Sequence, residues 1–275
     1  MSPSTDLLAF RRTLATGTAA RVFLVLAAMA GTAIYVFPLG NPTLGAALFA
    51  AAALVYFYLS WKSIAVSRDA MPAHEHLARG NLPEAEQLLT TALRKFSLFP
   101  SQRAVELLQL AQLRFEQSRY IESADLANAV LSLRSPAPIL ASAQLVRLEA
   151  VTELLDLPRV HAGLLALAKL PLSHADSARL MYCRTLYEVA LSAHDHTLYL
   201  LPGKLQLAQA LSGPRYARWC LELARSALAA GRHELFDHLV ARAVAVGDSA
   251  NLARKVPDLA DAVDKAALHP EFGRI

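Results

Sequence analysis

The chain has 275 residues, with 27 Lys and Arg, 23 Asp and Glu, and 55% apolar side chains. This composition excludes intrinsic disorder, a collagen-like fibre and a disulfide-dense scaffold. A soluble domain usually has about 45–50% apolar residues, and the excess here is local, because no charged residue occurs between Arg21 and Lys62. From Ser63 onward the chain carries 23 basic and 22 acidic residues. Because this balance is ordinary, we expect no nucleic-acid binding.

Two apolar stretches, residues 22–39 and 43–60, fill the charge-free segment. Each is close to the roughly 20 residues that a helix needs to cross a bilayer. Between them stands Pro-Leu-Gly-Asn-Pro, residues 38–42, which predicts a tight connection. We therefore predict a transmembrane helical hairpin over residues 21–62 with membrane contact through residues 22–60. A cytoplasmic or interfacial segment (1–20) precedes it, and a linker (63–70) and a helical repeat domain (71–275) follow.

Basic residues flank both ends of the predicted hairpin: Arg11, Arg12 and Arg21 before it, and Lys62 after it, against Asp6 alone. The positive-inside rule then places both termini and the repeat domain in the cytoplasm. The chain has 21 arginines and 6 lysines, a bias typical of a GC-rich bacterial genome, so we expect a multi-pass protein of a bacterial inner membrane. A signal peptide cleaved after residues 28–30 is the alternative, but the apolar stretch before that site is short.

Small residues at helical spacing predict how the hairpin packs. Ala27 and Gly31 form one small-xxx-small pair, and Ala46 and Ala50 form another. Such pairs let helix backbones approach closely, although alanine is abundant throughout this chain. The N-terminal segment can form an interfacial helix that places Leu7, Leu8, Phe10 and Leu14 on one side and Arg11 and Arg12 on the other.

From about residue 71 the sequence predicts helix after helix, with Pro and Gly between them and no alternating strand pattern. The segment Gly80-Asn81-Leu82-Pro83-Glu84-Ala85 is followed by Leu89 and Ala92, and Pro100 closes it. This pattern resembles the tetratricopeptide repeat, in which glycine permits a tight turn and small residues let paired helices approach. Other repeats built from helix pairs could produce a similar pattern.

The pattern recurs with departures over residues 71–247. Ser118 replaces the turn glycine before Tyr120, and Asp156-Leu157-Pro158 form the third turn, so the large residues Leu82, Tyr120 and Leu157 are 38 and 37 apart. The repeat norm is about 34 residues. A fourth unit is interrupted at Pro202-Gly203, a fifth has its turn at Gly231, and a last helix is expected over about 258–268. The fold class predicted is all-α: a transmembrane hairpin followed by a tetratricopeptide-like α-solenoid.

The resemblance implies that first helices line a concave face that binds peptides or helices of other proteins, and it does not imply catalysis. Four arginines fall on consecutive predicted first helices and are the candidate partner-binding residues: Arg114, Arg147, Arg179 and Arg184. Guanidinium groups bind carboxylates bidentately, so an acidic or C-terminal segment is the expected ligand. Solvated helix faces are the alternative interpretation of the same arginines.

No motif predicts an enzyme, a metal site or a cofactor. The clusters His74/His76 and His194/Asp195/His196 have i, i+2 spacing, which places side chains on opposite sides of a helix. Cys183 and Cys220 lie in apolar helical patterns and are expected to be buried, reduced thiols rather than a disulfide or metal pair. Phosphate-binding and nucleophile motifs are absent, although dispersed catalytic residues would leave no local signature.

These observations predict a membrane-anchored adaptor or scaffold whose cytosolic repeats bind other proteins and assemble a membrane or envelope complex. The alternative is a structural accessory subunit of a larger membrane enzyme or of a photosynthetic or respiratory complex. In that case the repeats brace neighbouring membrane subunits rather than capture a mobile ligand.

Overall fold

A computed structural model describes residues 3–36, 42–133 and 135–268, and side chains from residues 12–34, 43–133 and 135–268. Every regular element in these ranges is a helix, as the sequence predicts. The predicted turn of the hairpin at residues 38–42 lies largely outside them, as do the side chains of Leu7, Leu8, Phe10 and Arg11. The chain divides into two compact units, residues 1–147 and 148–275, which are described separately below.

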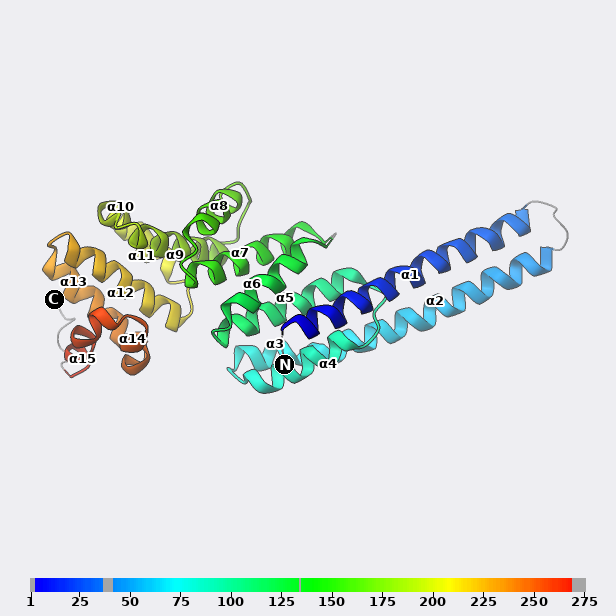
Figure 1. Cartoon of the computed structure of the whole chain (residues 1–275), viewed down its shortest axis with the longest axis horizontal. Helices are drawn as coiled ribbons and strands as arrows, with labels where there is room; N and C mark the ends of the chain where they lie inside the picture. The colour runs from blue at the N-terminus through cyan, green and yellow to red at the C-terminus, as the bar shows by residue number, and fades with distance from the viewer. Residues whose placement is uncertain (1–2, 37–41, 134, 269–275) are drawn as a thin grey trace. The chain divides into compact units, whose positions relative to one another are not determined.

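The first unit begins with two long helices, α1 (Pro3–Val36) and α2 (Pro42–Ala70), which lie side by side (Figure 1). The shorter helices that follow are α3 (Pro72–Ala78), α4 (Leu82–Arg94), α5 (Pro100–Glu116), α6 (Tyr120–Leu131) and most of α7 (Ala137–Glu153). Residues 3–20 of the expected N-terminal segment are therefore part of α1, and the expected linker, residues 63–70, continues α2.

The backbones of α1 and α2 approach most closely at Gly31. A Cβ atom added there would lie 3.1 Å from the Phe49 backbone nitrogen and 3.2 Å from the Gly45 carbonyl oxygen. Gly31 is buried, as its predicted role in helix packing requires, and so is Gly45. Ala46 and Ala50, in contrast, are exposed. The prediction of Ala46 and Ala50 as the second contact pair is therefore wrong, because α2 turns Gly45 toward α1 instead.

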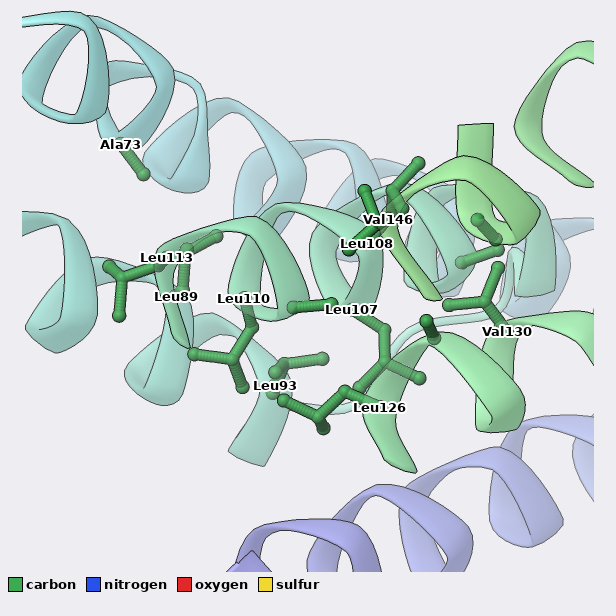
Figure 2. Close-up of a cluster of buried hydrophobic side chains, with 14 of the residues drawn as sticks. Ala73, Leu89, Leu93, Leu107, Leu108, Leu110, Leu113, Leu126, Val130 and Val146 are labelled. Carbon is green, nitrogen blue, oxygen red and sulfur yellow. The ribbon is translucent and has the colours of Figure 1, made fainter. Parts of the chain in front are cut away.

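A leucine-rich core holds the short helices of the first unit together (Figure 2). Leu107, Leu110 and Leu113 project from α5 and meet Leu89 of α4 and Leu126 of α6, all at most 3% exposed. Leu14 of α1 also packs against this core, so its side chain lies on protein rather than on the expected membrane interface. At the end of α2, Val66 and Ala70 form a smaller buried cluster with Ala92.

The second unit consists of α8 (Leu157–Leu167), α9 (His174–Ala190), α10 (His194–Leu198), α11 (Leu201–Ala208), α12 (Gly213–Ala229), α13 (His233–Val246), α14 (Ser249–Lys255), η1 (Pro257–Leu259) and α15 (Ala260–Leu268), with the end of α7. Trp219 is fully buried at its centre, and its indole N–H donates to the Thr185 hydroxyl at 3.0 Å. The interruption expected at Pro202-Gly203 lies earlier, at Tyr199 and Leu200 between α10 and α11, where Leu200 has φ 54°. Pro202 and Gly203 belong to the first turn of α11, because proline is tolerated there.

One turn geometry joins five helix pairs, α3–α4, α5–α6, α7–α8, α9–α10 and α12–α13. The first residue of each turn has positive φ. These residues are Gly80, Ser118, Leu155, Ser192 and Gly231, at intervals of 38, 37, 37 and 39 residues. The N–H of the following residue then bonds to the carbonyl five positions earlier, at 2.8–3.1 Å. This is the Schellman pattern, which satisfies the last carbonyls of a helix. Glycine adopts it freely, whereas serine and leucine do so at a cost.

Candidate functional site

Arg114, the first of the four candidate arginines, is 3% exposed. Its guanidinium group donates to the Glu86 carboxylate at 2.7 Å and to the Gln117 amide oxygen at 2.7 Å, and it lies 3.4 Å from Glu122. Burial alone would raise the pKa of Glu86, but the hydrogen bonds from Gln117 and Arg114 lower it. Arg114 therefore joins α5 to α4 and α6 and presents almost no surface to a partner.

Arg147 is half-buried and makes a 3.2 Å hydrogen bond to the side chain of Asn128 on α6. Arg184 is the most accessible of the four, with a side chain that is 58% exposed. It donates to Glu188 one helical turn away on α9, at 2.7 Å. Both guanidinium groups are therefore in contact with solvent, and both already hold a neighbouring side chain.

Arg179 is 19% exposed at its side chain and binds Glu149 of α7 through two hydrogen bonds of 2.9 and 2.6 Å. Burial alone would lower the pKa of Arg179, but the Glu149 carboxylate overcomes this and raises it. Glu149 itself is 1% exposed, and Arg215 of α12 lies 3.7 Å from it. A single buried carboxylate therefore connects three successive first helices.

A second connection of the same kind lies nearby in this unit. Arg218 of α12 donates to both carboxylate oxygens of Glu153, which also accepts a 3.3 Å hydrogen bond from Tyr182 of α9. Arg225 binds Asp258 bidentately at 2.8 and 2.6 Å and donates to Glu222 at 2.8 Å. We refer to these contacts of Glu149, Glu153, Glu222 and Asp258 with their arginines as the ion-pair ladder.

The sequence prediction does not include the carboxylates of the ion-pair ladder, although the positions of Arg179 and Glu149 in the repeat indicate one of the pairs. Arg179 and Arg218 each stand 13 residues before the positive-φ residue of their own helix pair, and so occupy equivalent positions. Glu149 stands 6 residues before the corresponding residue, Leu155, of the preceding pair. This register predicts the pairing of Glu149 with Arg179 on the next first helix. It does not predict the partner of Arg218, which is Glu153, two first helices back.

A concave site of a different kind lies in the first unit, between α1, α2 and the loop of residues 95–99. We refer to this cavity of about 520 Å³ as the hairpin pocket. Its walls are apolar apart from Arg21 and Tyr56: Leu24, Val25, Ala28, Phe49, Ala52, Ala53, Phe57, Leu98 and Phe99. The guanidinium carbon of Arg21 lies 5.9 Å from the centre of the Phe99 ring, a cation–π distance. From the sequence alone, Arg21 indicates only the orientation of the hairpin.

The loop that closes the hairpin pocket is hydrogen-bonded to α2 and packs closely on α1. The Leu98 N–H donates to the Ser63 hydroxyl at 2.8 Å, and that hydroxyl donates to the Leu59 carbonyl at 2.7 Å. On the other side, a Cβ atom at Gly17 would lie only 2.6 Å from the Ser97 carbonyl oxygen. Glycine is required at this position because any side chain would collide with backbone.

The cysteines and histidines form no such site among the described residues. Cys183 and Cys220 are free and fully buried, as predicted, and burial raises the pKa of both thiols, that of Cys220 to about 11. Across residues 3–36, 42–133 and 135–268, no three His, Cys, Asp or Glu side chains are placed to hold a metal ion. His196 binds Glu188 at 2.7 Å.

These features define an all-helical chain with two helices that are long and apolar enough to cross a membrane. No protein-family profile, curated protein or solved structure matches it. Its function must therefore be argued from its own residues.

Proposed function

We propose that the chain is a membrane-anchored adaptor in which α1 and α2 cross a bacterial inner membrane and the helix pairs that follow bind other proteins. On this proposal the pairs form a tetratricopeptide-like solenoid, and the complex they assemble is a membrane or envelope complex. The observation that carries it is continuity: an exposed apolar hairpin runs directly, through α2, into an array of helix pairs.

The accessibility of the hairpin supports insertion into lipid. The candidate spans, Arg12–Ile34 and Thr43–Ala78, are only 17% and 11% buried over their most apolar windows. Phe23, Leu54 and Trp61 are 70–71% exposed. A monomeric soluble protein rarely exposes a large continuous apolar surface, and a core helix would bury these side chains. A lipid bilayer would solvate these apolar side chains without a protein partner.

Orientation follows from the positive-inside rule and can be tested by cysteine labelling. Asn41→Cys, in the connection between the spans, should react with an impermeant reagent from outside the cell. Met71→Cys, whose parent side chain is 74% exposed, should react only after the membrane is opened. The buried native thiols should not compete. Labelling of Met71→Cys from outside would contradict a cytoplasmic repeat domain.

The shared turn supports a solenoid of repeated pairs. Five turns with one hydrogen-bond pattern and near-constant spacing are what a repeat array requires, since each pair packs chiefly on its neighbours. Such arrays present extended surfaces, and protein binding is their common use. The accessible candidates for contacting a partner are Arg147 and Arg184, because Arg114 and Arg179 are largely occupied in internal ion pairs.

The ion-pair ladder favours a second candidate function. If arginines on successive first helices are neutralised by buried carboxylates, the array is stiff and its first-helix side chains are already paired. A stiff array suits a structural accessory subunit of a larger membrane enzyme or of a photosynthetic or respiratory complex. In that role the chain contacts its neighbouring subunits permanently, and these subunits bind the exposed hairpin as well as the repeats.

Affinity purification of the tagged chain in a gentle detergent, followed by mass spectrometry, tests both candidates. The double variant Arg147→Gln/Arg184→Gln should lose at least one partner by severalfold if the repeats capture an acidic ligand. The matched control is Arg79→Gln/Arg159→Gln, which removes the same charge from side chains that are 73% and 76% exposed.

The possible outcomes separate the two functions. Loss of a partner only in the first double variant supports the adaptor. Equal recovery from both variants, with the same membrane subunits at fixed stoichiometry, supports the accessory subunit. Recovery of no stoichiometric protein from either would contradict both proposals.

A further inference from the structure

We infer that the hairpin pocket is a binding site for an anionic phospholipid, whose phosphate contacts Arg21 and whose acyl chain lies between α1 and α2. This inference rests on the proposed insertion of the hairpin into a membrane. It adds a specific ligand to a segment that otherwise serves only as an anchor.

The walls of the hairpin pocket come from one face of each helix. On α1 they stand at positions 21, 24, 25 and 28, and on α2 at positions 49, 52, 53, 56 and 57. Both series follow the i, i+3, i+4, i+7 spacing of a single helical face, which on α2 continues to i+8 at Phe57. At 1.5 Å per residue, the wall on α1 extends about 10 Å from Arg21 toward Ala28. An elongated apolar cavity of this form fits an alkyl chain better than a compact polar metabolite.

Polarity is concentrated at one end of the cavity. Arg21 and Lys62 bound the charge-free segment, so Arg21 stands where hydrocarbon gives way to head groups. No described carboxylate forms an ion pair with Arg21, which instead lies over the Phe99 ring. Tyr56 lines the same cavity and can donate a hydrogen bond. A cation and a phenol at the head-group end of an apolar slot match a lipid phosphate followed by its acyl chain.

The pocket has a wall besides the two helices. Leu98 is 1% exposed, and its N–H is held by Ser63, so the loop closes the head-group end as a third wall. Lipids that merely surround a hairpin contact one helix face and exchange freely. Basic pockets between transmembrane helices on the cytoplasmic side, in contrast, bind anionic head groups. Charge favours phosphatidylglycerol or cardiolipin over zwitterionic phosphatidylcholine.

The test is native mass spectrometry of the full chain purified in detergent and supplied with phosphatidylglycerol or phosphatidylcholine of identical acyl chains. The wild type should retain one phosphatidylglycerol in preference to phosphatidylcholine. Arg21→Gln should lower that preference about fivefold, the effect of one interfacial charge. Lys62→Gln, an equal charge change at an exposed residue outside the pocket, should preserve it.

A second pair of variants tests the apolar part independently of charge. Ala53→Phe places a ring in the cavity and should abolish retention of both lipids, whereas Ala50→Phe adds the same ring on an exposed part of α2 and should not. Equal effects of Arg21→Gln and Lys62→Gln, or full retention by Ala53→Phe, would overturn the inference and identify the lipids as non-specific.

Alkaline extraction of membranes separates this inference from the proposed function. Release of the wild-type chain into the supernatant would overturn the membrane anchor and the lipid site together. A chain that stays in the membrane but retains lipid without preference would overturn the lipid site alone.

Discussion

The hairpin α1–α2 and the pair α12–α13 are both antiparallel helix pairs rich in apolar residues, but they place their large side chains oppositely. Phe23 and Leu54 of the hairpin are each 71% exposed, whereas Trp219 and Leu223 of α12 are fully buried. The two helices of the hairpin approach each other closely at glycine backbone, whereas α12 packs against its neighbours through large side chains. On the proposed membrane anchor this difference reflects two solvents, because a large continuous apolar surface is rarely exposed to water, whereas lipid solvates it.

The largest expected effect tests this difference between exposed and buried large side chains directly. Trp219→Ala should destabilise the chain by about 3–5 kcal/mol, because it leaves a cavity in a closed core and deprives Thr185 of its indole donor. Phe23→Ala should change the free energy of unfolding by a few tenths of a kcal/mol, since its ring contacts mainly the surroundings. Thermal melts of the purified chain in detergent measure both. Equal losses of stability would show that Phe23 is packed on protein and that the hairpin is not lipid-facing.

The second comparison is between a buried and an exposed carboxylate. Glu149→Gln removes the charge that binds Arg179 and should cost about 1.5–3 kcal/mol, because the guanidinium group keeps little access to water. Glu75→Gln, from a pair whose side chains are 68–73% exposed, should cost about 0–0.5 kcal/mol. Denaturant unfolding followed by circular dichroism gives both values. A negligible cost for Glu149→Gln would mean that the ladder does not stabilise the array.

The third comparison concerns the small residues of the repeat register. Ala85 is fully buried between paired helices, so Ala85→Leu should overpack the α3–α4 pair and cost about 1–3 kcal/mol. Glu84→Leu adds a similar side chain at the neighbouring exposed position and should leave the melting temperature almost unchanged. Similar melting temperatures for Ala85→Leu and the wild type would show that the assigned register is wrong.

The smallest expected effect is dependent on pH. The hydrogen bond from Arg225 holds the pKa of Asp258 below its usual value, so this carboxylate stabilises the fold above its unfolded pKa of about 3.9. That contribution is lost as the pH falls through the lower, folded value. The side chain of Asp258 is 51% exposed, so solvent screens the ion pair. Its contribution to the free energy of unfolding is therefore less than about 1 kcal/mol.

Asp258→Asn should therefore be slightly less stable than the wild type at pH 7, and the two should converge below pH 4. Asp264→Asn, at an exposed position on α15, is the control and should match the wild type throughout. A stability difference for Asp258→Asn that is independent of pH would show that the contact acts through packing rather than charge.

Local features of the fold could be predicted from the sequence because local chemistry decides them. A 40-residue segment without charge predicts the long apolar helices, and Gly80 and Gly231 predict turns because glycine accepts positive φ. The sequence predicts the third turn to begin one residue late, at Asp156, whereas Leu155 has positive φ. A leucine at such a position gives no sequence signal, since only the packing of the helices on either side enforces it.

The sequence by itself determined an all-helical chain, its apolar N-terminal segment, the spacing of its helix pairs and the burial of its cysteines, because period and composition report on burial. Only the tertiary structure decided that Glu149, Glu153 and Asp258 meet Arg179, Arg218 and Arg225, since these partners are 30, 65 and 33 residues apart and pair through helix packing. The hairpin pocket likewise depends on tertiary structure. It exists because Ser63 binds the loop to α2 and Gly17 lets α1 approach the loop backbone. These residues are distant from the loop in sequence, and short-range patterns carry no record of such contacts.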